Sequence, residues 1–204
     1  DISENTTPNL VSDMDKLREH LGLDEWMIFG GSWGSTLALS YATSHTDRVK
    51  GLILRGIFLC REKEIAWYYE EDGAHRIFPE EWERYKAQIP GVEPGNMVEA
   101  YHKLLTSDDE QVRLTAALTW SRWEAATSKL VDDGSLTTKF EDPHLALSFA
   151  RIENHYFRNG IFLPSDDYLL EEVAKLQGIP TRIVQGRYDM VCPIGTAWEV
   201  KKAM

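Results

Sequence analysis

Three short apolar runs punctuate the chain, at residues 26–29, 49–54 and 181–185. Runs of this length, set between turn residues and helix-like segments, are typical of buried strands in a parallel sheet with covered faces. The pattern therefore predicts an α/β fold with about three recognisable parallel strands.

Apolar residues at helical spacing precede the first strand. Thr7 and Pro8 supply a cap and a first-turn proline, and Gly22 ends the predicted helix. Its apolar stripe consists of Leu10, Met14, Leu17 and Leu21. We expect this stripe to pack on a larger sheet, and we expect further helices at residues 36–42 and from about 165 to 178.

Residues 61–164 have a different character from the rest of the chain. This span is rich in Trp, Tyr and Glu, is interrupted by prolines, and predicts several short helices without strands. We therefore expect a partial core formed by residues 1–60 and 165–204, with an all-helical cap domain inserted at 61–164.

Composition narrows the class of partner. The 204 residues carry a formal net charge of −11, which argues against nucleic acid and anionic membranes as partners. The sequence shows no transmembrane-length apolar stretch and no signal-peptide pattern, and Cys60 and Cys192 form neither a disulfide framework nor a metal-type spacing. We expect a cytoplasmic protein that uses no cofactor and no metal.

The candidate nucleophile is Ser32, in the pentapeptide Gly-Gly-Ser-Trp-Gly at residues 30–34. This G-x-S-x-G pattern lies between a predicted strand and a predicted helix, as in a nucleophile elbow. Such a turn exposes the serine hydroxyl and aims the backbone N–H groups that follow it at a developing oxyanion. An ordinary glycine-rich turn is the alternative.

An activated serine needs an acid and a base. Asp189 follows the third predicted strand and is the candidate acid, with a turn or cap aspartate as the alternative. The elbow fold places its histidine after the acid, but no histidine follows Asp189. The histidines of the chain are His20, His45, His75, His102, His144 and His155.

The chain resembles the proline iminopeptidases, serine aminopeptidases of the α/β-hydrolase fold that release N-terminal proline from peptides. The matching segments are residues 5–7, 30–39, 55–58, 120–124, 151–157 and 186–193. The resemblance implies that Ser32 is the acylated nucleophile, that Asp189 is the triad acid, and that Trp33 supplies one oxyanion N–H through its backbone.

The resemblance also implies a substrate site. Glu124 and Glu153 would hold the charged N-terminus of the peptide, with Arg55 nearby as a charge partner. Phe58 and Tyr68 would form the apolar slot for the pyrrolidine ring. From the residues alone, both glutamates flank aromatic positions on predicted helices, where a carboxylate is costly to bury unless a cation binds there. Solvated surface glutamates are the alternative.

Proline iminopeptidases are longer than this chain at both ends, where they carry the other oxyanion donor and the triad histidine. We therefore expect the 204 residues to be the middle of such an enzyme, nearly inactive alone. We also expect self-association through the open sheet edges.

Two alternatives to the aminopeptidase remain. One is an esterase or a broader aminopeptidase on the same scaffold, because a fold does not fix a substrate. The other is a non-catalytic binding or assembly fragment. Dehalogenase and epoxide-hydrolase chemistry is disfavoured, because those enzymes place Asp at the elbow where this chain has Ser32.

Overall fold

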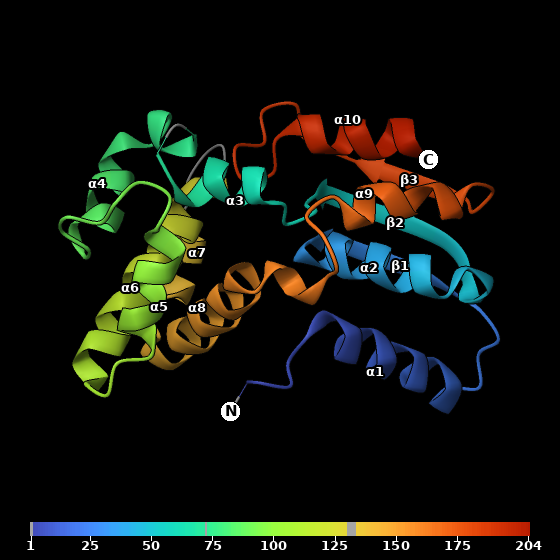
Figure 1. The fold of residues 1–204 in the computed structure, drawn as a ribbon, viewed down its shortest axis with the longest axis horizontal. Coiled ribbons are helices and arrows are strands. Elements are labelled where there is room, and N and C mark those ends of the chain that lie inside the picture. The colour runs from blue at the N-terminus through green and yellow to red at the C-terminus, as the bar shows by residue number, and fades with distance from the viewer. Residues whose placement is uncertain (1, 72, 130–133) are drawn as a thin grey trace. The chain divides into compact units, whose positions relative to one another are not determined.

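The computed structural model describes residues 2–71, 73–129 and 134–204, and these form two compact units (Figure 1). The core unit consists of residues 1–64 and 160–204, and the helical unit of residues 65–159. The assignment of the inserted segment as a cap domain with bounds 61–164 stays a prediction.

The core unit is built on a three-stranded parallel sheet in the order β1-β2-β3. Its strands are β1 (Trp26–Ser32), β2 (Val49–Ile57) and β3 (Thr181–Val184). All three predicted strands are therefore confirmed. β1 and β2 extend three residues beyond their predicted ends, since pairing continues through the glycines and Arg55 up to Ser32 and Ile57.

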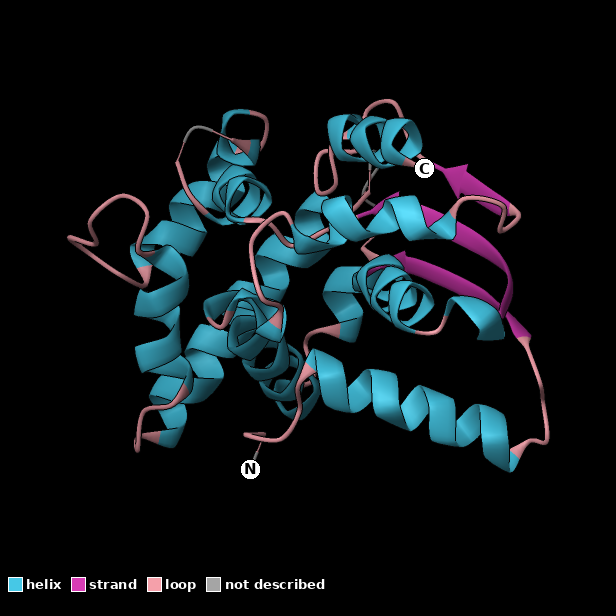
Figure 2. Ribbon diagram, turned by 45° about the vertical axis from the view of Figure 1, so that its right-hand side comes forward, coloured by secondary structure: helices cyan, strands magenta, loops and turns pink. Residues whose placement is uncertain are grey.

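Helices lie on one side of these strands (Figure 2). Both crossovers run in the same direction along the sheet, and right-handed connections then place them on the same face. The helices of this unit are α1 (Thr7–His20), α2 (Trp33–Ser44), α9 (Tyr168–Glu172) and α10 (Ile194–Ala203), with 3₁₀ turns at Thr46–Arg48, Gly160–Phe162 and Val173–Leu176. The helix expected at about 165–178 is thus a short α-helix continued by a 3₁₀ turn.

The two faces of the sheet differ in exposure. Ile28, Leu52 and Leu54 are buried against the helices. On the opposite face, the side chains of Phe29 and Val184 are 70% and 60% exposed. The expectation of a sheet covered on both faces is therefore wrong for the described part of the chain.

Helix α1 packs on α2 rather than on the sheet. The Tyr41 hydroxyl donates to Asp15 across the two helices at 2.9 Å. Gly22, at φ +66°, ends the helix as predicted, and the Leu23 N–H closes the turn on the Arg18 carbonyl. Half of the expected apolar stripe is exposed, since α2 covers only one side of it. Its exposed members are Leu17 and Leu21.

A buried ion cluster ties the two halves of the core unit together. The guanidinium of Arg61, 2% exposed, contacts Glu64 at 2.7 Å, Asp167 at 3.2 Å and Glu199 at 2.6 Å. Thr196 also donates its hydroxyl to Glu64 at 2.8 Å. The cluster therefore links the end of the first core segment to α9 and α10.

In its described residues the helical unit contains helices and no strand. They are α3 (Glu62–Tyr69, which begins in the core unit), a 3₁₀ turn at Ala74–Arg76, α4 (Pro79–Ala87), α5 (Met97–Leu105), α6 (Glu110–Thr127), α7 (Ser135–Lys139) and α8 (Pro143–Arg158). Stacked aromatic rings form its centre: Tyr85 lies 4.5 Å from Tyr101 and 5.7 Å from Trp123, ring centre to ring centre. The all-helical character expected from the sequence is confirmed.

Candidate active site

Strand β1 ends and helix α2 begins at a single strained residue, Ser32. Its backbone has φ +55° and ψ −126°, a region that residues other than glycine seldom occupy. The side chain is exposed. A strained, exposed serine between strand and helix is the geometry of a nucleophile elbow.

Gly30 is what permits this turn. A Cβ atom on Gly30 would lie 2.1 Å from the Gly34 carbonyl oxygen and 3.1 Å from the Ala38 Cβ. Gly34 itself has open space where a side chain would begin. Of the two outer glycines in the motif, packing thus requires the first, because β1 and α2 nearly touch there.

The first helical residue, Trp33, presents its backbone N–H at the N-terminus of α2. The N–H groups at the N-terminus of a helix favour negative charge. Phe58 lies just behind the turn and is half-buried. Its N–H donates to Ser35 Oγ at 3.1 Å, and its carbonyl accepts from Thr36 Oγ1 at 2.6 Å.

The carboxylate of Asp189 lies near the backbone of Ser32. Asp189 Oδ1 accepts from the N–H groups of Val191 at 3.2 Å and Cys192 at 2.9 Å. A Cβ built on Gly56 would lie 3.8 Å from both Asp189 Oδ2 and the Ser32 nitrogen. The structure thus brings the two predicted catalytic residues together on either side of Gly56.

No described histidine of the core unit hydrogen-bonds to Ser32. His20 lies in the last turn of α1, and His45 stacks on Tyr41 with ring centres 4.9 Å apart. The predicted charge partner Arg55 is an exposed side chain on the open sheet face, where its Nε lies 3.4 Å from a Cβ built on Gly31.

The helical unit holds Glu124 on α6 and Glu153 on α8 among aromatic rings. The Trp120 indole N–H donates to Glu153 Oε2 at 2.9 Å, and the Tyr69 hydroxyl donates to Glu124 Oε1. The ring of Tyr69 stacks on that of Trp120, with centres 4.6 Å apart. Neither carboxylate forms an ion pair with a described Lys, Arg or His.

The surroundings oppose ionisation of both carboxyl groups. Burial raises the pKa of Glu124 to about 7. Burial, together with the nearby charge of Glu124, raises the pKa of Glu153 well above its usual range. Hydrogen bonds from Tyr69 and Trp120 act in the opposite direction but are outweighed. These surroundings therefore favour the protonated, neutral form of both carboxyl groups.

The remaining predicted substrate residue, Tyr68, is buried beside this pair. Its ring centre lies 5.5 Å from that of Trp123, and its hydroxyl hydrogen-bonds to Thr127 Oγ1. Sequence reasoning missed Tyr69 as a direct partner of Glu124. The spacing of Trp120 four residues before Glu124 pointed to an aromatic surface but not to which hydroxyl or indole N–H faces a carboxylate.

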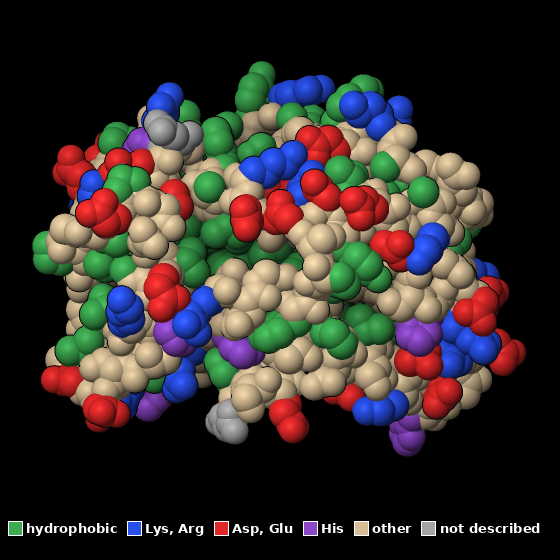
Figure 3. Space-filling view, viewed as in Figure 1, with side chains coloured by type: hydrophobic (Ala, Val, Ile, Leu, Met, Phe, Trp, Pro, Cys, Tyr) green, Lys and Arg blue, Asp and Glu red, His purple; other side chains and the backbone are tan. Residues whose placement is uncertain are grey.

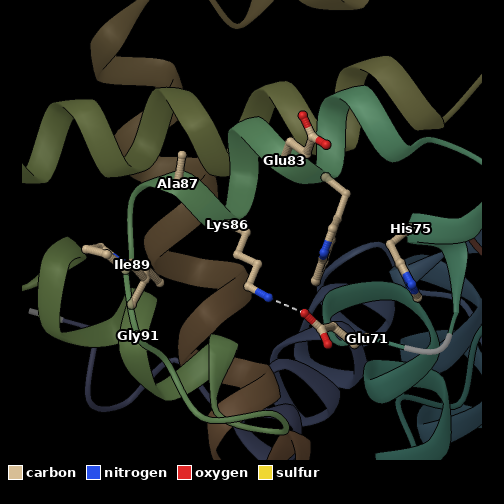
Figure 4. A pocket seen from close by; sticks show the side chains of 9 residues that line it. Glu71, His75, Glu83, Lys86, Ala87, Ile89 and Gly91 are labelled. Atoms are coloured by element: carbon tan, nitrogen blue, oxygen red, sulfur yellow. Dashed lines mark hydrogen bonds and ion pairs between the residues drawn. The ribbon is translucent and has the colours of Figure 1, made fainter.

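A pocket of about 540 Å³ also lies in the helical unit, between Trp82, Ile89 and Pro90 (Figure 4). Lys86 and Glu71 form an ion pair at its wall. None of the residues predicted to bind substrate lines this pocket. On the face that Figure 3 shows, acidic side chains lie among Lys and Arg side chains.

Within residues 2–71, 73–129 and 134–204, no group of His, Cys, Asp and Glu side chains has the arrangement needed to hold a metal ion. The same residues include no helix long and apolar enough to cross a membrane.

A sheet of parallel strands carrying a strained serine elbow is the architecture of the α/β-hydrolases. Residues 2–203 match the family model for the alpha/beta hydrolase fold, and the chain belongs to this family. An alpha/beta fold family hydrolase from Bacillus anthracis has a similar structure, with a TM-score of 0.61 and 18% identity, covering 100% of this chain and 65% of that one. The expected fold class is confirmed.

Within this family the chain is similar to proline iminopeptidases. It is 55% identical over 204 residues to the probable proline iminopeptidase of Leptolyngbya boryana, covering 100% of this chain and 63% of that protein. It is 54% identical over 203 residues to the proline iminopeptidase of Arabidopsis thaliana, covering 99% and 53%. The resemblance found in the sequence is confirmed, and the chain spans less than two thirds of these relatives.

The glutamate pair makes stability depend on pH. A raised carboxyl pKa stabilises the folded chain below the usual value of about 4.5, and this stabilisation is lost as pH rises through about 7. Glu153→Gln removes one of these ionisations. The variant should therefore match the wild type at pH 4 and exceed it by roughly 1–3 kcal/mol at pH 8, measured by urea unfolding.

Glu83→Gln is the matched control, because Glu83 is an exposed glutamate of the same unit without an ion pair to a described residue. It should follow the wild-type pH dependence. A difference between wild type and Glu153→Gln that stays constant from pH 4 to 8 would contradict the assignment.

Proposed function

We propose that the protein of which these residues are part is a serine aminopeptidase that releases proline from the N-terminus of peptides. The observation that carries the proposal is the pair Glu124 and Glu153, two carboxylates among aromatic rings with no described cationic partner. A peptide N-terminus supplies the missing positive charge, and a pyrrolidine ring suits an aromatic surface. The names of the similar proteins support the same activity.

In this proposal Ser32 attacks the carbonyl carbon of the first residue, the peptide C–N bond breaks, and an acyl-enzyme forms while the rest of the peptide leaves as an amine that takes a proton from the histidine. The Trp33 N–H stabilises the oxyanion, and Asp189 orients the histidine that accepts the serine proton. Glu124 and Glu153 bind the substrate ammonium, with Tyr68 and Phe58 contacting the ring and Arg55 balancing charge. Water then releases free proline and restores Ser32.

Replacing either glutamate by Gln in the full-length enzyme should weaken aminopeptidase activity selectively. Glu124→Gln and Glu153→Gln each remove a charge that faces the ammonium, so kcat/KM for a proline arylamide should fall roughly 5- to 150-fold, or about 1–3 kcal/mol. By contrast, kcat/KM for a nitrophenyl ester, which has no ammonium group, should change by less than about threefold.

The exposed Glu83→Gln variant is again the control, and kcat/KM for both substrates should stay at the wild-type value. An equal loss on both substrates, or no loss on either, would favour the esterase alternative. The binding or assembly alternative predicts that neither substrate is cleaved by the full-length protein.

The 204-residue polypeptide by itself should be nearly inactive. Neither histidine of its core unit hydrogen-bonds to Ser32, and a missing base leaves the serine protonated. Incubation with a proline arylamide should give hydrolysis close to that of a Ser32→Ala variant. Turnover more than about tenfold above that variant would require one of the six histidines to act as the base.

We propose that the isolated polypeptide also self-associates through its open sheet edges, the strands β1 and β3, which carry exposed apolar side chains. Met27, Phe29 and Val184 are exposed there by 61%, 70% and 60%. Large exposed apolar side chains of this kind promote association, and the net charge of −11 is screened within about 8 Å at physiological salt. Light scattering should show mass increasing with concentration, and Phe29→Lys should reduce this. A monomer at all micromolar concentrations would refute the proposal.

A further inference from the structure

The side chain of Gln185 lies between the end of strand β2 and the loop that carries Asp189. Gln185 follows β3 directly, and its Oε1 accepts from the Ile57 N–H at 2.7 Å. Its Nε2 donates to the Cys192 carbonyl at 2.7 Å and to Asp189 Oδ2 at 3.3 Å. The half-buried amide of Gln185 therefore links the end of β2 and the end of β3 to the carboxylate of Asp189.

The partners of Gln185 fix which way its amide group points. The Ile57 N–H can only donate, so it requires the oxygen, whereas the Cys192 carbonyl and the Asp189 carboxylate can only accept, so they require the NH₂ group. A reversed amide would oppose donor to donor on one side and acceptor to acceptor on the other. The NH₂ group is thus held towards Asp189.

The pairing of β2 with β1 connects these contacts to Ser32, the proposed nucleophile. Ile57 is the register partner of Ser32 across β1 and β2, and both the Ser32 nitrogen and Asp189 Oδ2 lie 3.8 Å from a Cβ built on Gly56. The two oxygens of Asp189 then have separate partners. Oδ1 accepts from backbone N–H groups of its own loop, while Oδ2 accepts from Gln185 and lies near Gly56.

We propose that Gln185 is a positioning residue that sets the orientation of Asp189 Oδ2 relative to Ser32. This inference rests on the proposed roles of Ser32 and Asp189 in catalysis, but not on the identity of the substrate. Gln185 does two things at once: it tethers the acid loop to β2, and it places an N–H beside the carboxylate oxygen that Val191 and Cys192 leave free.

The hydrogen-bond pattern explains why an amide is needed at this position. A carboxylate of the same length could still accept from Ile57, but it would place negative charge against Asp189 and an acceptor against the Cys192 carbonyl. Leu has a similar volume and would leave the Ile57 N–H and the Cys192 carbonyl without their partner. Either change should turn or loosen the carboxylate while the sheet remains.

The test uses Gln185→Glu and Gln185→Leu in the full-length protein, with Gln177→Glu as the matched control. Gln177 is an exposed glutamine of the core unit, so its replacement adds the same charge away from Asp189. For Gln185→Glu we expect kcat to fall at least tenfold with KM changed less than twofold. The acid limb of the pH–rate profile should move to higher pH, because the added charge stabilises a protonated base.

Gln185→Leu should lower kcat several-fold without moving that limb, and Gln177→Glu should change neither quantity. Both Gln185 variants should affect the proline arylamide and the nitrophenyl ester equally, because the acid serves both reactions. Activity losses that follow KM, or an acid limb that Gln185→Glu leaves in place, would overturn the proposal.

The substrate pattern separates this inference from the proposed function. If the Glu124 and Glu153 variants show no selectivity for the arylamide but Gln185→Glu still lowers kcat on the ester, the positioning role stands and the aminopeptidase proposal fails. If the Glu124 and Glu153 variants are selective for the arylamide but Gln185→Glu leaves kcat unchanged, the positioning role of Gln185 fails and the aminopeptidase proposal stands.

A measurement that does not depend on catalysis tests the contact between Gln185 and Asp189, even if the protein is inactive or a Gln185 variant does not fold. In ¹⁵N NMR of the 204-residue chain, the Gln185 side-chain NH₂ signal should be slow to exchange with solvent. It should also shift on Asp189→Asn replacement, whereas the Gln177 signal should not. A rapidly exchanging Gln185 amide that ignores the Asp189→Asn change would overturn the contact and the proposal with it.

Discussion

The turn at Ser32 is the constraint on which the rest of the core unit depends. β1 can pass into α2 within one residue only because Gly30 lets the Gly34 carbonyl approach to 2.1 Å of where a side chain would begin. This approach lays α2 against the sheet and commits Ser32 to a positive φ that it would not adopt in a relaxed chain. The packing of α2 on β1 and β2 supplies the free energy that holds the strained residue.

The carboxylates of the two units show that the same chemical group has different properties in different surroundings. Asp189 accepts backbone N–H groups and an amide N–H, and these donors fix the direction of its oxygens. Within the described part of the chain, the carboxyl groups of Glu124 and Glu153 accept hydrogen bonds only from phenol or indole groups amid aromatic rings, so a negative charge on them is costly unless a cation binds nearby. The first arrangement suits a carboxylate that orients another group, and the second suits one that binds a cation.

Much of this arrangement could be predicted from the sequence, because it depends on local signals. The apolar runs gave all three strands, and the spacing around Ser32 gave the elbow. Side-chain partners brought together by folding were not predictable. Tyr69 was overlooked beside Tyr68 because both are aromatic residues on one short helix. Gln185 was overlooked because its partners, Ile57 and Asp189, lie on opposite sides of it in the sequence.

The Arg61 cluster has a consequence for how this architecture can change over evolution. The cluster joins the two segments of the core unit and uses no residue of the helical unit. It consists of Arg61 and Glu64 from the first segment and of Asp167, Thr196 and Glu199 from the second. A buried guanidinium with several carboxylates is costly to break, so the junction is durable. Residues 65–159 are therefore an exchangeable module. A lineage can then replace these helices while the core unit is inherited intact.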